Sequence, residues 1–294
     1  MKKKLLALSV LTAISSQAGA FEFDTGDNWS IRWDNTFKAN VMSRVAKQDP
    51  ELIAPSGRNP EPAWYLADDA DLSVDRSNLG LVSTRLDLLT EFDVIYKDSF
   101  GFRISAAGWY DYMYKDESDH PKDRFLSWAS PSVRPGKYTD ETKDLHYFGG
   151  EVLDAFVFAN WDMGNMAANV RLGRHTIYWG QSLLGTGATH GAASAMAALD
   201  FNKALAVPGS EANELFMPTN KISTVIQLTD NATLNAFYNM EHQEYRLPAT
   251  GSYFNPAEGL TEDTEFGSVF SQSEVIRAGV EFDKDETDWG DWGI

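Results

Sequence analysis

WSIRWDNTFKANVMSRV, the stretch from residue 29 to residue 45, decides the fold because its side chains alternate in character. Its odd positions are mostly apolar and include Trp29, Ile31 and Trp33, whereas its even positions are mostly polar and include Arg32 and Asp34. A period of two residues places these two sets on opposite faces of a β-strand. The stretch therefore predicts a strand with one apolar face and one charged face.

The same alternation recurs along the chain. It is clear in 85–96 and 100–114, where apolar and aromatic residues at even positions alternate with Arg85, Asp87 and Arg103. Weaker copies occupy 151–161, 168–179, 222–228, 233–242 and 274–282, and a further one begins near Trp289. We therefore expect an all-β chain with about eight or nine antiparallel strands.

The connections between these strands alternate between long and short. Long connections cover 46–78, 115–150, 183–221 and 243–273, and short ones cover 97–99, 162–167, 229–232 and 283–288. In outer-membrane barrels, short turns face the periplasm and long loops face outside. In a soluble β-sandwich, nothing requires the short and the long connections to lie at opposite ends. The pattern favours a transmembrane antiparallel β-barrel with four long extracellular loops, and a soluble β-sheet is the alternative.

Composition excludes several other classes of protein. The chain has 294 residues, no cysteine and a formal net charge of -18. The absence of cysteine excludes a disulfide scaffold and a cysteine-ligated metal site. No run of about 20 apolar residues is present to cross a bilayer as a helix. The acidic balance argues against nucleic acid as a partner, because phosphate backbones are bound by basic surfaces.

The first twenty residues predict an export signal. Lys2, Lys3 and Lys4 form a basic segment, residues 5–14 form an apolar segment, and Ala18-Gly19-Ala20 fits a cleavage site. We expect residues 1–20 to be a signal peptide and residues 21–294 to be a barrel domain in the bacterial outer membrane. The site has no lipid-attachment cysteine, so we expect no lipid anchor at the processed N-terminus.

The polar face of each predicted strand should line the barrel lumen, and the apolar face should meet lipid. We expect Ile31, Leu88, Ile104 and Leu172 to face lipid. Acids and bases balance on the opposite face, so the acidic excess falls in loops and turns. The predicted lumen-lining residues are Arg32, Asp34, Lys38, Arg85, Asp87, Glu91, Asp93, Arg103, Asp111, Arg171, His175, Arg277 and Glu281.

Aromatic residues gather near the predicted strand ends. Rings at these positions are typical of the girdles that membrane barrels place at the two lipid–water interfaces. Ordinary strand propensity accounts for some of them as well. The predicted girdle residues are Trp29, Trp33, Tyr96, Phe100, Tyr112, Tyr114, Trp161 and Tyr178.

Several short motifs, taken in order, resemble a known family. They are Arg32 to Asn35, Asp71-Leu72-Ser73, Asn78 to Arg85, Glu91-Phe92-Asp93, Gly108 to Asp111, Arg171 to His175, Tyr178-Trp179-Gly180, Pro208-Gly209 with Glu214-Leu215 and Pro218, and Leu247-Pro248 with Gly251-Ser252-Tyr253. This order resembles the DUF 1302 family of proteobacterial outer-membrane proteins. The resemblance covers most of the chain after the signal, with His175 at a position where we expect the family more often to have Gln.

The resemblance implies an outer-membrane barrel that moves hydrophobic molecules together with periplasmic and inner-membrane partners. It supplies no catalytic residues. The family is about twice as long as this chain, which stops as a strand begins and lacks the terminal Phe used in barrel assembly. We therefore expect this chain to be the N-terminal portion of a longer barrel.

Motifs for chemistry are weak. Gly180 to Gly185 misses the spacing of a nucleophile elbow by one residue, which leaves Ser182 with His175 or His190 as the only candidate for an esterase-like enzyme. Asp68, Asp69, Asp71 and Asp75 do not have the spacing of an EF-hand, so a solvated acidic loop is favoured over a calcium site. The histidines lack the spacing of a zinc site. We expect no catalytic residue, cofactor or metal.

The loop 183–221 is rich in small residues and contains Pro208-Gly209 and Pro218. Such a loop can fold into the lumen as a constriction or pack at the outer rim. We expect a porin-like channel or transport barrel for small molecules of unknown identity, in contact with lipid, lipopolysaccharide and a periplasmic partner. An outer-membrane enzyme and a structural or adhesion barrel are the alternatives.

Overall fold

The computed structural model describes residues 12–44, 80–116, 136–162, 164, 166–177, 197–210, 212–255, 266–270, 275–279 and 290–294. Several residues discussed above lie outside these ranges. They include Lys2 to Lys4 of the predicted signal, the four aspartates of the acidic loop, Tyr178-Trp179-Gly180, Ser182, His190, Glu281 and Trp289.

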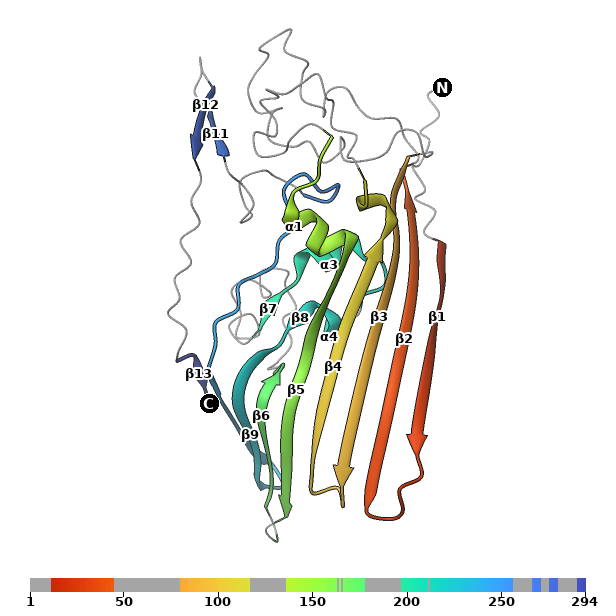
Figure 1. Ribbon diagram of the computed structural model, residues 1–294. Helices are drawn as coiled ribbons and strands as arrows, with labels where there is room; N and C mark the ends of the chain where they lie inside the picture. The colour runs from red at the N-terminus through yellow and green to blue at the C-terminus, as the bar shows by residue number, and fades with distance from the viewer. Residues whose placement is uncertain are drawn as a thin grey trace, which may run out of the picture.

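Nine strands form one antiparallel sheet (Figure 1). In spatial order they are β1 (Thr12–Phe23), β2 (Trp29–Ser43), β3 (Leu81–Tyr96), β4 (Phe100–Asp111), β5 (Phe148–Asp162), β6 (Ala167–His175), β9 (Thr219–Thr229), β10 (Ala232–Asn239) and β13 (Trp292–Gly293). Each strand pairs with its neighbours in an antiparallel ladder. In the part that the structure describes, β1 and β13 are the two edges, so the sheet is open.

The short connections predicted at 97–99, 162–167 and 229–232 are confirmed, and the one predicted at 283–288 lies outside the described residues. The turns β1–β2, β3–β4, β5–β6 and β9–β10 are short and lie together at one end, whereas the connections β2–β3, β4–β5, β6–β9 and β10–β13 are long and leave the other end (Figure 1). The β3–β4 turn is tight because Lys97 and Asp98 both adopt positive φ, at 48° and 54°. Positive φ at successive turn positions matches the twist of a hairpin.

The structure corrects three of the predicted strands. The segment predicted as a strand over 274–282 contributes β12 (Val275–Gly279), which pairs with β11 (Phe266–Phe270) in a separate hairpin, so Arg277 is not on the main sheet. The strand predicted to run to Tyr114 ends at Asp111, whose carboxylate accepts a hydrogen bond from the Met113 amide and caps a 3-10 helix, Tyr112–Tyr114. The strand β6 ends at His175, before the predicted end at 179.

The first strand overlaps the predicted signal. Thr12 to Phe23 pairs with β2, with Phe21 opposite Trp33 and Phe23 opposite Ile31. Processing after Ala20 remains a prediction, and it would leave only Phe21–Phe23 of β1 in the sheet.

One face of the sheet is apolar and exposed. Phe37, Ile104 and Leu172 have 57%, 49% and 47% of their surface exposed, on three different strands. At the short-turn end of this face, Trp29, Tyr96 and Phe100 form a row of rings with centroid distances of 4.6 and 5.1 Å. Phe148 and Trp292 are exposed rings nearer the opposite end. Tyr114 departs from the predicted girdle because it is buried, at 2% exposure.

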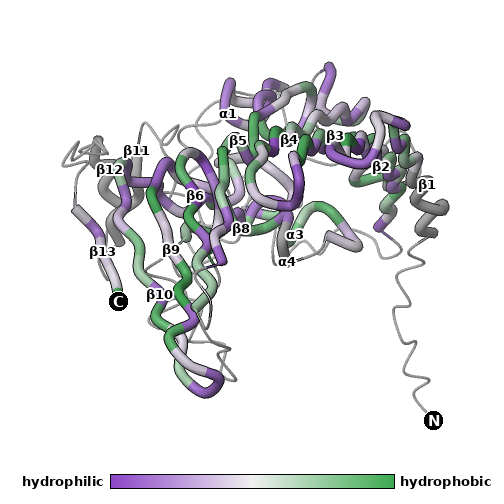
Figure 2. The backbone as a smooth tube through the Cα atoms, turned by 90° about the horizontal axis from the view of Figure 1, so that it is seen from below, coloured by the Kyte–Doolittle hydropathy of each residue, from purple (hydrophilic) through white to green (hydrophobic). Residues whose placement is uncertain are grey.

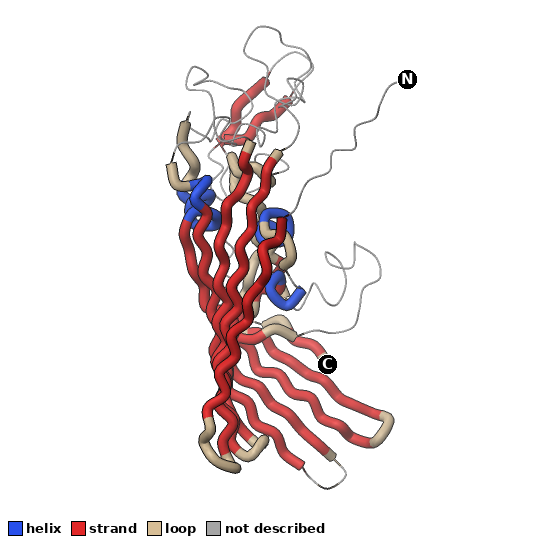
Figure 3. The backbone as a smooth tube through the Cα atoms, turned by 90° about the vertical axis from the view of Figure 1, so that its right-hand side faces the viewer, coloured by secondary structure: helices blue, strands red, loops and turns tan. Residues whose placement is uncertain are grey.

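The other face of the sheet is concave and partly filled. Figures 2 and 3 show the sheet curving around α3 (Phe201–Ala206), α4 (Ala212–Leu215) and β8 (Phe216–Met217). The strand β8 pairs with β7 (Ala198–Leu199) in a small second ladder. We call residues 197–217 of the described chain the inner segment. No helix among the described residues has the length and apolar character needed to cross a membrane.

The connection β4–β5 packs beside the inner segment. It contains α1 (Asp140–Thr142), capped by the Thr139 hydroxyl, and a π-helical turn, Lys143–Tyr147. The Thr142 hydroxyl donates a hydrogen bond to the Thr250 carbonyl oxygen at 3.0 Å. The connections after β4, β6 and β10 therefore meet in one cluster at the long-loop end.

A glycine in β6 is required by the fold. Gly173 has φ +122°, and a Cβ at this position would lie 2.4 Å from the Ala155 carbonyl oxygen on β5. We expect Gly173→Ala to lower the free energy of unfolding by about 1–3 kcal/mol, the usual cost of a disfavoured backbone conformation, with the clash adding to it. Urea denaturation of the folded protein measures this change.

Gly108→Ala is the matched control for this prediction. Gly108 also lies within a strand, but a Cβ there would meet nothing closer than 3.7 Å and its φ is not positive. Equal stability of the two variants would show that the conformation of Gly173 is not what β6 requires.

Candidate functional site: the concave face of the sheet

A network of ion pairs covers the concave face of β2, β3, β4 and β5 near the short-turn end. Arg32 lies 2.8 Å from Asp34 and 3.2 Å from Asp93, and Arg103 lies 2.6 Å from Glu91. Strand register explains the network, because directly opposed residues such as Arg32 and Asp93, or Asp93 and Arg103, point to the same face. Single exposed ion pairs contribute little, and a shared network fixes the side chains more firmly.

A bulge in β5 adds one carboxylate to this network. Ile104 pairs with Ala155 and Ala106 with Val152, so Ser105 faces two residues of β5. The Ser105 hydroxyl accepts a hydrogen bond from the Asp154 amide at 2.9 Å. The bulge therefore brings Asp154 to the charged face, 3.9 Å from Arg103.

Nearer the long-loop end, two further bases are held by carboxylates. Lys38 forms an ion pair with Glu214 of α4 and also donates a hydrogen bond to the Gly209 carbonyl oxygen at 3.3 Å. Arg85 lies 2.9 Å from Asp87 and donates to the Leu145 carbonyl oxygen at 3.1 Å. Lys38 thus joins β2 to the inner segment, and Arg85 joins β3 to the π-helical turn.

Arg246 joins the inner segment to strand β5. Its guanidinium lies 2.7 Å from Asp200, at the N-terminus of α3, and 2.9 Å from Glu151 on β5. Burial alone would lower the pKa of Arg246, but the carboxylates of Asp200 and Glu151 raise it above its usual value. The side chain is therefore charged at any pH at which the protein is folded.

His146 forms a buried contact between the β4–β5 connection and α3. Its ring stacks on Tyr114 with a centroid distance of 4.5 Å, and the Asn202 side chain of α3 lies close enough to influence its pKa. Burial, together with the nearby charge of Arg85, lowers the pKa of His146 to about 3. Burial also raises the pKa of the Tyr114 hydroxyl well above its usual value. Both rings are neutral in the folded protein at pH 7.

The concave face of β5 and β6 is aromatic. Phe156 and Phe158 lie side by side with a centroid distance of 6.3 Å, and the guanidinium of Arg171 lies 5.5 Å from the centre of the Phe156 ring. Gly101 and Gly173 make room for them, because a Cβ at Gly101 would meet the Phe158 ring at 2.9 Å. This half of the face therefore differs from the ion-pair network on β2 to β4.

His175 contacts Ser223, whereas the sequence motifs predict Ser182 as its partner. Its Nε2 lies 2.7 Å from the Ser223 hydroxyl of β9, and its Nδ1 lies 2.9 Å from the Gly173 carbonyl oxygen. A donor at Nδ1 leaves Nε2 to accept from the hydroxyl, as in a serine–histidine pair. However, the His175 side chain is buried, at 1% exposure, against Phe156.

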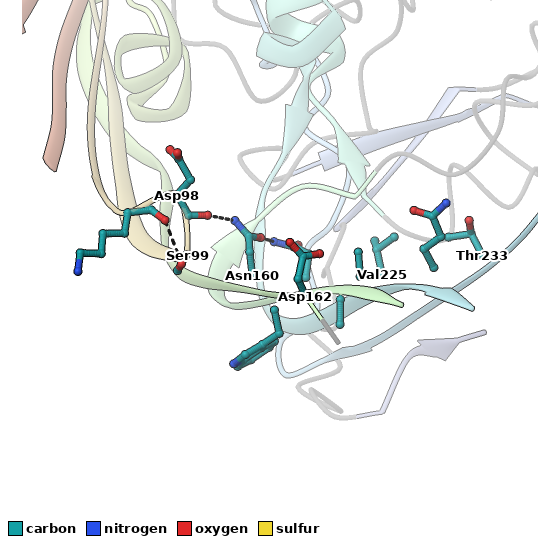
Figure 4. A pocket seen from close by; sticks show the side chains of 12 residues that line it. Asp98, Ser99, Asn160, Asp162, Val225 and Thr233 are labelled. Atoms are coloured by element: carbon teal, nitrogen blue, oxygen red, sulfur yellow. Dashed lines mark hydrogen bonds between the residues drawn. The ribbon is translucent and has the colours of Figure 1, made fainter. Parts of the chain in front are cut away.

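A pocket of about 530 Å³ opens at the short-turn end of the sheet. Figure 4 shows Asp98 and Ser99 of the β3–β4 turn beside Asn160 and Asp162 at the end of β5. Asn160 donates to the Asp98 carbonyl oxygen at 2.8 Å and accepts from Asn169 at 2.6 Å. The pocket lining mixes these polar side chains with apolar ones, including Trp161 and Val225.

The structure brings most of the predicted lining residues together on the concave face. They are Arg32, Asp34, Lys38, Arg85, Asp87, Glu91, Asp93, Arg103, Asp111, Arg171 and His175. Asp111 accepts hydrogen bonds from the hydroxyls of Ser83 and Thr84 instead of pairing with a base. Arg277 lies on the separate hairpin, and Glu281 is outside the described residues.

Side-chain periodicity does not predict the residues that complete these contacts. Asp154 and Glu151 lie on opposite sides of a bulge, so no single period of two can place both on one face. Asp200, Glu214 and Arg246 lie in long connections, where side-chain periodicity gives no signal. In the described part of the chain, no group of three histidine or acidic side chains is arranged to hold a metal ion.

Removing Arg246 should loosen the inner segment. Arg246→Gln leaves the Asp200 carboxylate without its charged partner, a change that costs about 1–3 kcal/mol for a buried charged group. We expect faster amide hydrogen exchange at Asp200 and Phe201, whose N–H groups donate to Leu215 and to the Arg246 carbonyl oxygen. Lys203→Gln on α3 is the control. Unchanged exchange in Arg246→Gln would contradict the role of this ion pair.

Protonation of His146 should destabilise the same cluster. The pKa is about 3 in the folded protein and 6.5 for an unperturbed histidine, so the unfolded state binds the proton first as pH falls. Stability from neutral His146 is complete above pH 6.5 and is lost between pH 6.5 and about 3, by up to about 1.4 kcal/mol per pH unit. The difference in the free energy of unfolding between wild type and His146→Asn, measured by urea denaturation, should therefore become smaller as pH falls. A constant difference would contradict this.

The comparisons with known proteins place the chain in a family. The family model described as Protein of unknown function (DUF1302) matches residues 1–294. No curated protein matches the chain. No solved structure matches it. The match extends over the whole sequence, including every strand of the curved sheet and the inner segment, and the chain therefore belongs to the DUF1302 family.

Proposed function

We propose that this protein is an outer-membrane channel or transport barrel whose strands cross the membrane and whose concave face lines the route of a small molecule. The observation that supports this most is the division of the sheet into two unlike faces. Apolar side chains are exposed on the convex face, and ion pairs occupy the concave face. A soluble sheet would bury its apolar face, whereas a membrane barrel exposes that face to lipid.

Two further features support a membrane location. Aromatic rings gather at the short-turn end of the convex face, as in the girdles of membrane barrels. The short turns share one end and the long connections share the other, which fits a periplasmic and an extracellular side. In a bilayer the open edges of the sheet must become paired, because unpaired backbone groups in hydrocarbon cost several kcal/mol each.

The inner segment is the proposed constriction. It is fixed to β2 through Lys38 and Glu214 and to β5 through Arg246 and Glu151. Because these contacts come from two separated strands, the segment spans the concavity instead of lying along its rim. A permeating molecule would pass between the inner segment and the strands toward the pocket at the short-turn end. A periplasmic partner would meet the protein at that end.

A transport role also suits the chemistry of the face better than catalysis does. The His175–Ser223 pair has the hydrogen bonds of a nucleophile and base, but the ring is buried and a substrate could not reach it. The proposed protein thus needs no cofactor, and its partners are lipid, lipopolysaccharide and its small-molecule substrate.

The proposal is tested by loosening the inner segment. Glu214→Lys places two ammonium groups at the contact with Lys38, and like charges in contact repel each other. We expect this variant of the full-length protein to have a higher single-channel conductance in planar bilayers and to make cells more sensitive to bulky antibiotics.

The charge-swapped double variant, Lys38→Glu with Glu214→Lys, is the control. It restores an ion pair of opposite polarity and should return conductance toward that of the wild type. A wild-type protein that assembles in the membrane without any conductance would refute the channel. Equal conductance of all three proteins would show that the inner segment is not its constriction.

A further inference from the structure

Arg171 differs from five other bases of the concave face. Arg32, Lys38, Arg85, Arg103 and Arg246 each lie within 4.0 Å of a carboxylate. Among the described residues, no carboxylate lies within that distance of Arg171. Asp154 feels the charge of Arg171, but it lies 3.9 Å from Arg103. Arg171 is exposed, so its charge is available to a molecule on this face.

The guanidinium of Arg171 is held in place by an aromatic ring instead of a carboxylate. It lies 5.5 Å from the centre of the Phe156 ring, within the range of a cation–π contact. The ring itself is positioned by His175, at a centroid distance of 5.4 Å, and by Gly173 beside it. A cation–π contact of this kind does not use the guanidinium N–H groups as hydrogen-bond donors, so they can donate to an incoming acceptor.

An apolar surface continues from Arg171 along β5. Phe158 is directly opposite Arg171 in the β5–β6 ladder. Toward the short turn, the next pair on the same face is Asn160 with Asn169. Phe156 and Phe158 are both partly exposed. On this face of the two strands, the order toward the short turn is therefore Phe156, then Phe158 with Arg171 opposite it, then the pair of amides.

We propose that this surface, formed by Arg171, Phe156 and Phe158, binds an amphiphilic anion, that is, a molecule with an apolar or aromatic body and one carboxylate head group. This proposal rests on the proposed transport function and names its substrate class. The head group would accept the N–H groups of Arg171, and the body would lie on the two rings. Arg–carboxylate hydrogen bonds are charge-assisted and can be bidentate, which favours an anion over a neutral analogue.

The rest of the concave face favours this location for the anion. The network on β2 to β4 has its bases paired with Glu91, Asp93, Asp34 and Asp154, so an anion gains nothing by approaching it. A cation would be repelled by Arg171 and attracted to the network, where four carboxylates share the two guanidinium groups of Arg32 and Arg103. An anion is therefore drawn to the aromatic half of the face.

The test uses 4-phenylbutyrate as the probe and 4-phenylbutan-1-ol as its neutral analogue. Isothermal titration calorimetry of the full-length protein in lipid nanodiscs measures both affinities. We expect Arg171→Gln to bind 4-phenylbutyrate about tenfold more weakly, the loss expected for one hydrogen bond to a charged group, and to bind the alcohol unchanged. Arg171→Lys should retain part of the affinity for the anion, and Phe156→Leu should weaken both ligands.

Lys115→Gln is the matched control. The Lys115 ammonium also lies over an aromatic ring, 5.7 Å from the centre of Tyr112, but on the β4–β5 connection away from this surface. It should bind both probes as the wild type does. Equal affinity of wild type and Arg171→Gln for 4-phenylbutyrate, or no binding by the wild type, would overturn the proposal.

The same preparation separates this proposal from the channel. Anion binding that depends on Arg171, in a protein without conductance, would refute the channel and support the binding surface. Conductance together with anion binding that does not depend on Arg171 would refute the binding surface alone.

Discussion

An antiparallel ladder requires directly opposed residues to point to the same face, and the rest of this structure depends on that constraint. Arg32, Asp93 and Arg103 belong to three successive strands, yet they meet because they occupy one row across the ladder. By the same rule, Phe37, Leu88 and Gly108 lie together on the opposite face. Separation of charge from apolar surface is therefore a property of register, and a shift of one residue would reverse it for a whole strand.

The inner segment depends on the strands in a different way. Its own backbone pairing is limited to the two-residue strands β7 and β8 and a few hydrogen bonds, such as those from Phe201 and Asn202 to the Arg246 carbonyl oxygen. The segment is held mainly by side chains that reach it from β2 and β5 and from the connection containing His146. A rigid sheet thus supports a segment of lower intrinsic stability, which is the usual arrangement of a movable part.

The sequence is sufficient to predict the strands that alternate strictly and the parity of their connections. The period of two predicts the charged sides of β2, β3 and β4 directly. It does so because the register is continuous between β2 and β3 from Arg32 to Lys38, and between β3 and β4 throughout. Prediction fails where contacts are made between distant segments. Nothing in the pattern around Arg246 indicates that it reaches Asp200 and Glu151, and Tyr114 resembles a girdle residue until the 3-10 helix turns it inward.

The bulge in β5 has a consequence for the evolution of the strand. Before it, odd-numbered residues such as Glu151 face the concavity, and after it even-numbered residues such as Asp154 and Phe156 do so. The extra residue therefore changes which residues of β5 face the concavity, from odd-numbered to even-numbered ones. A single-residue insertion or deletion elsewhere in β5 would transpose the faces of everything beyond it, so length changes there must come in pairs. Beside Ser105, the ladder already accommodates an extra residue. A change of one residue there would move the bulge, and with it the point at which the residues of β5 that face the concavity change from odd to even numbers.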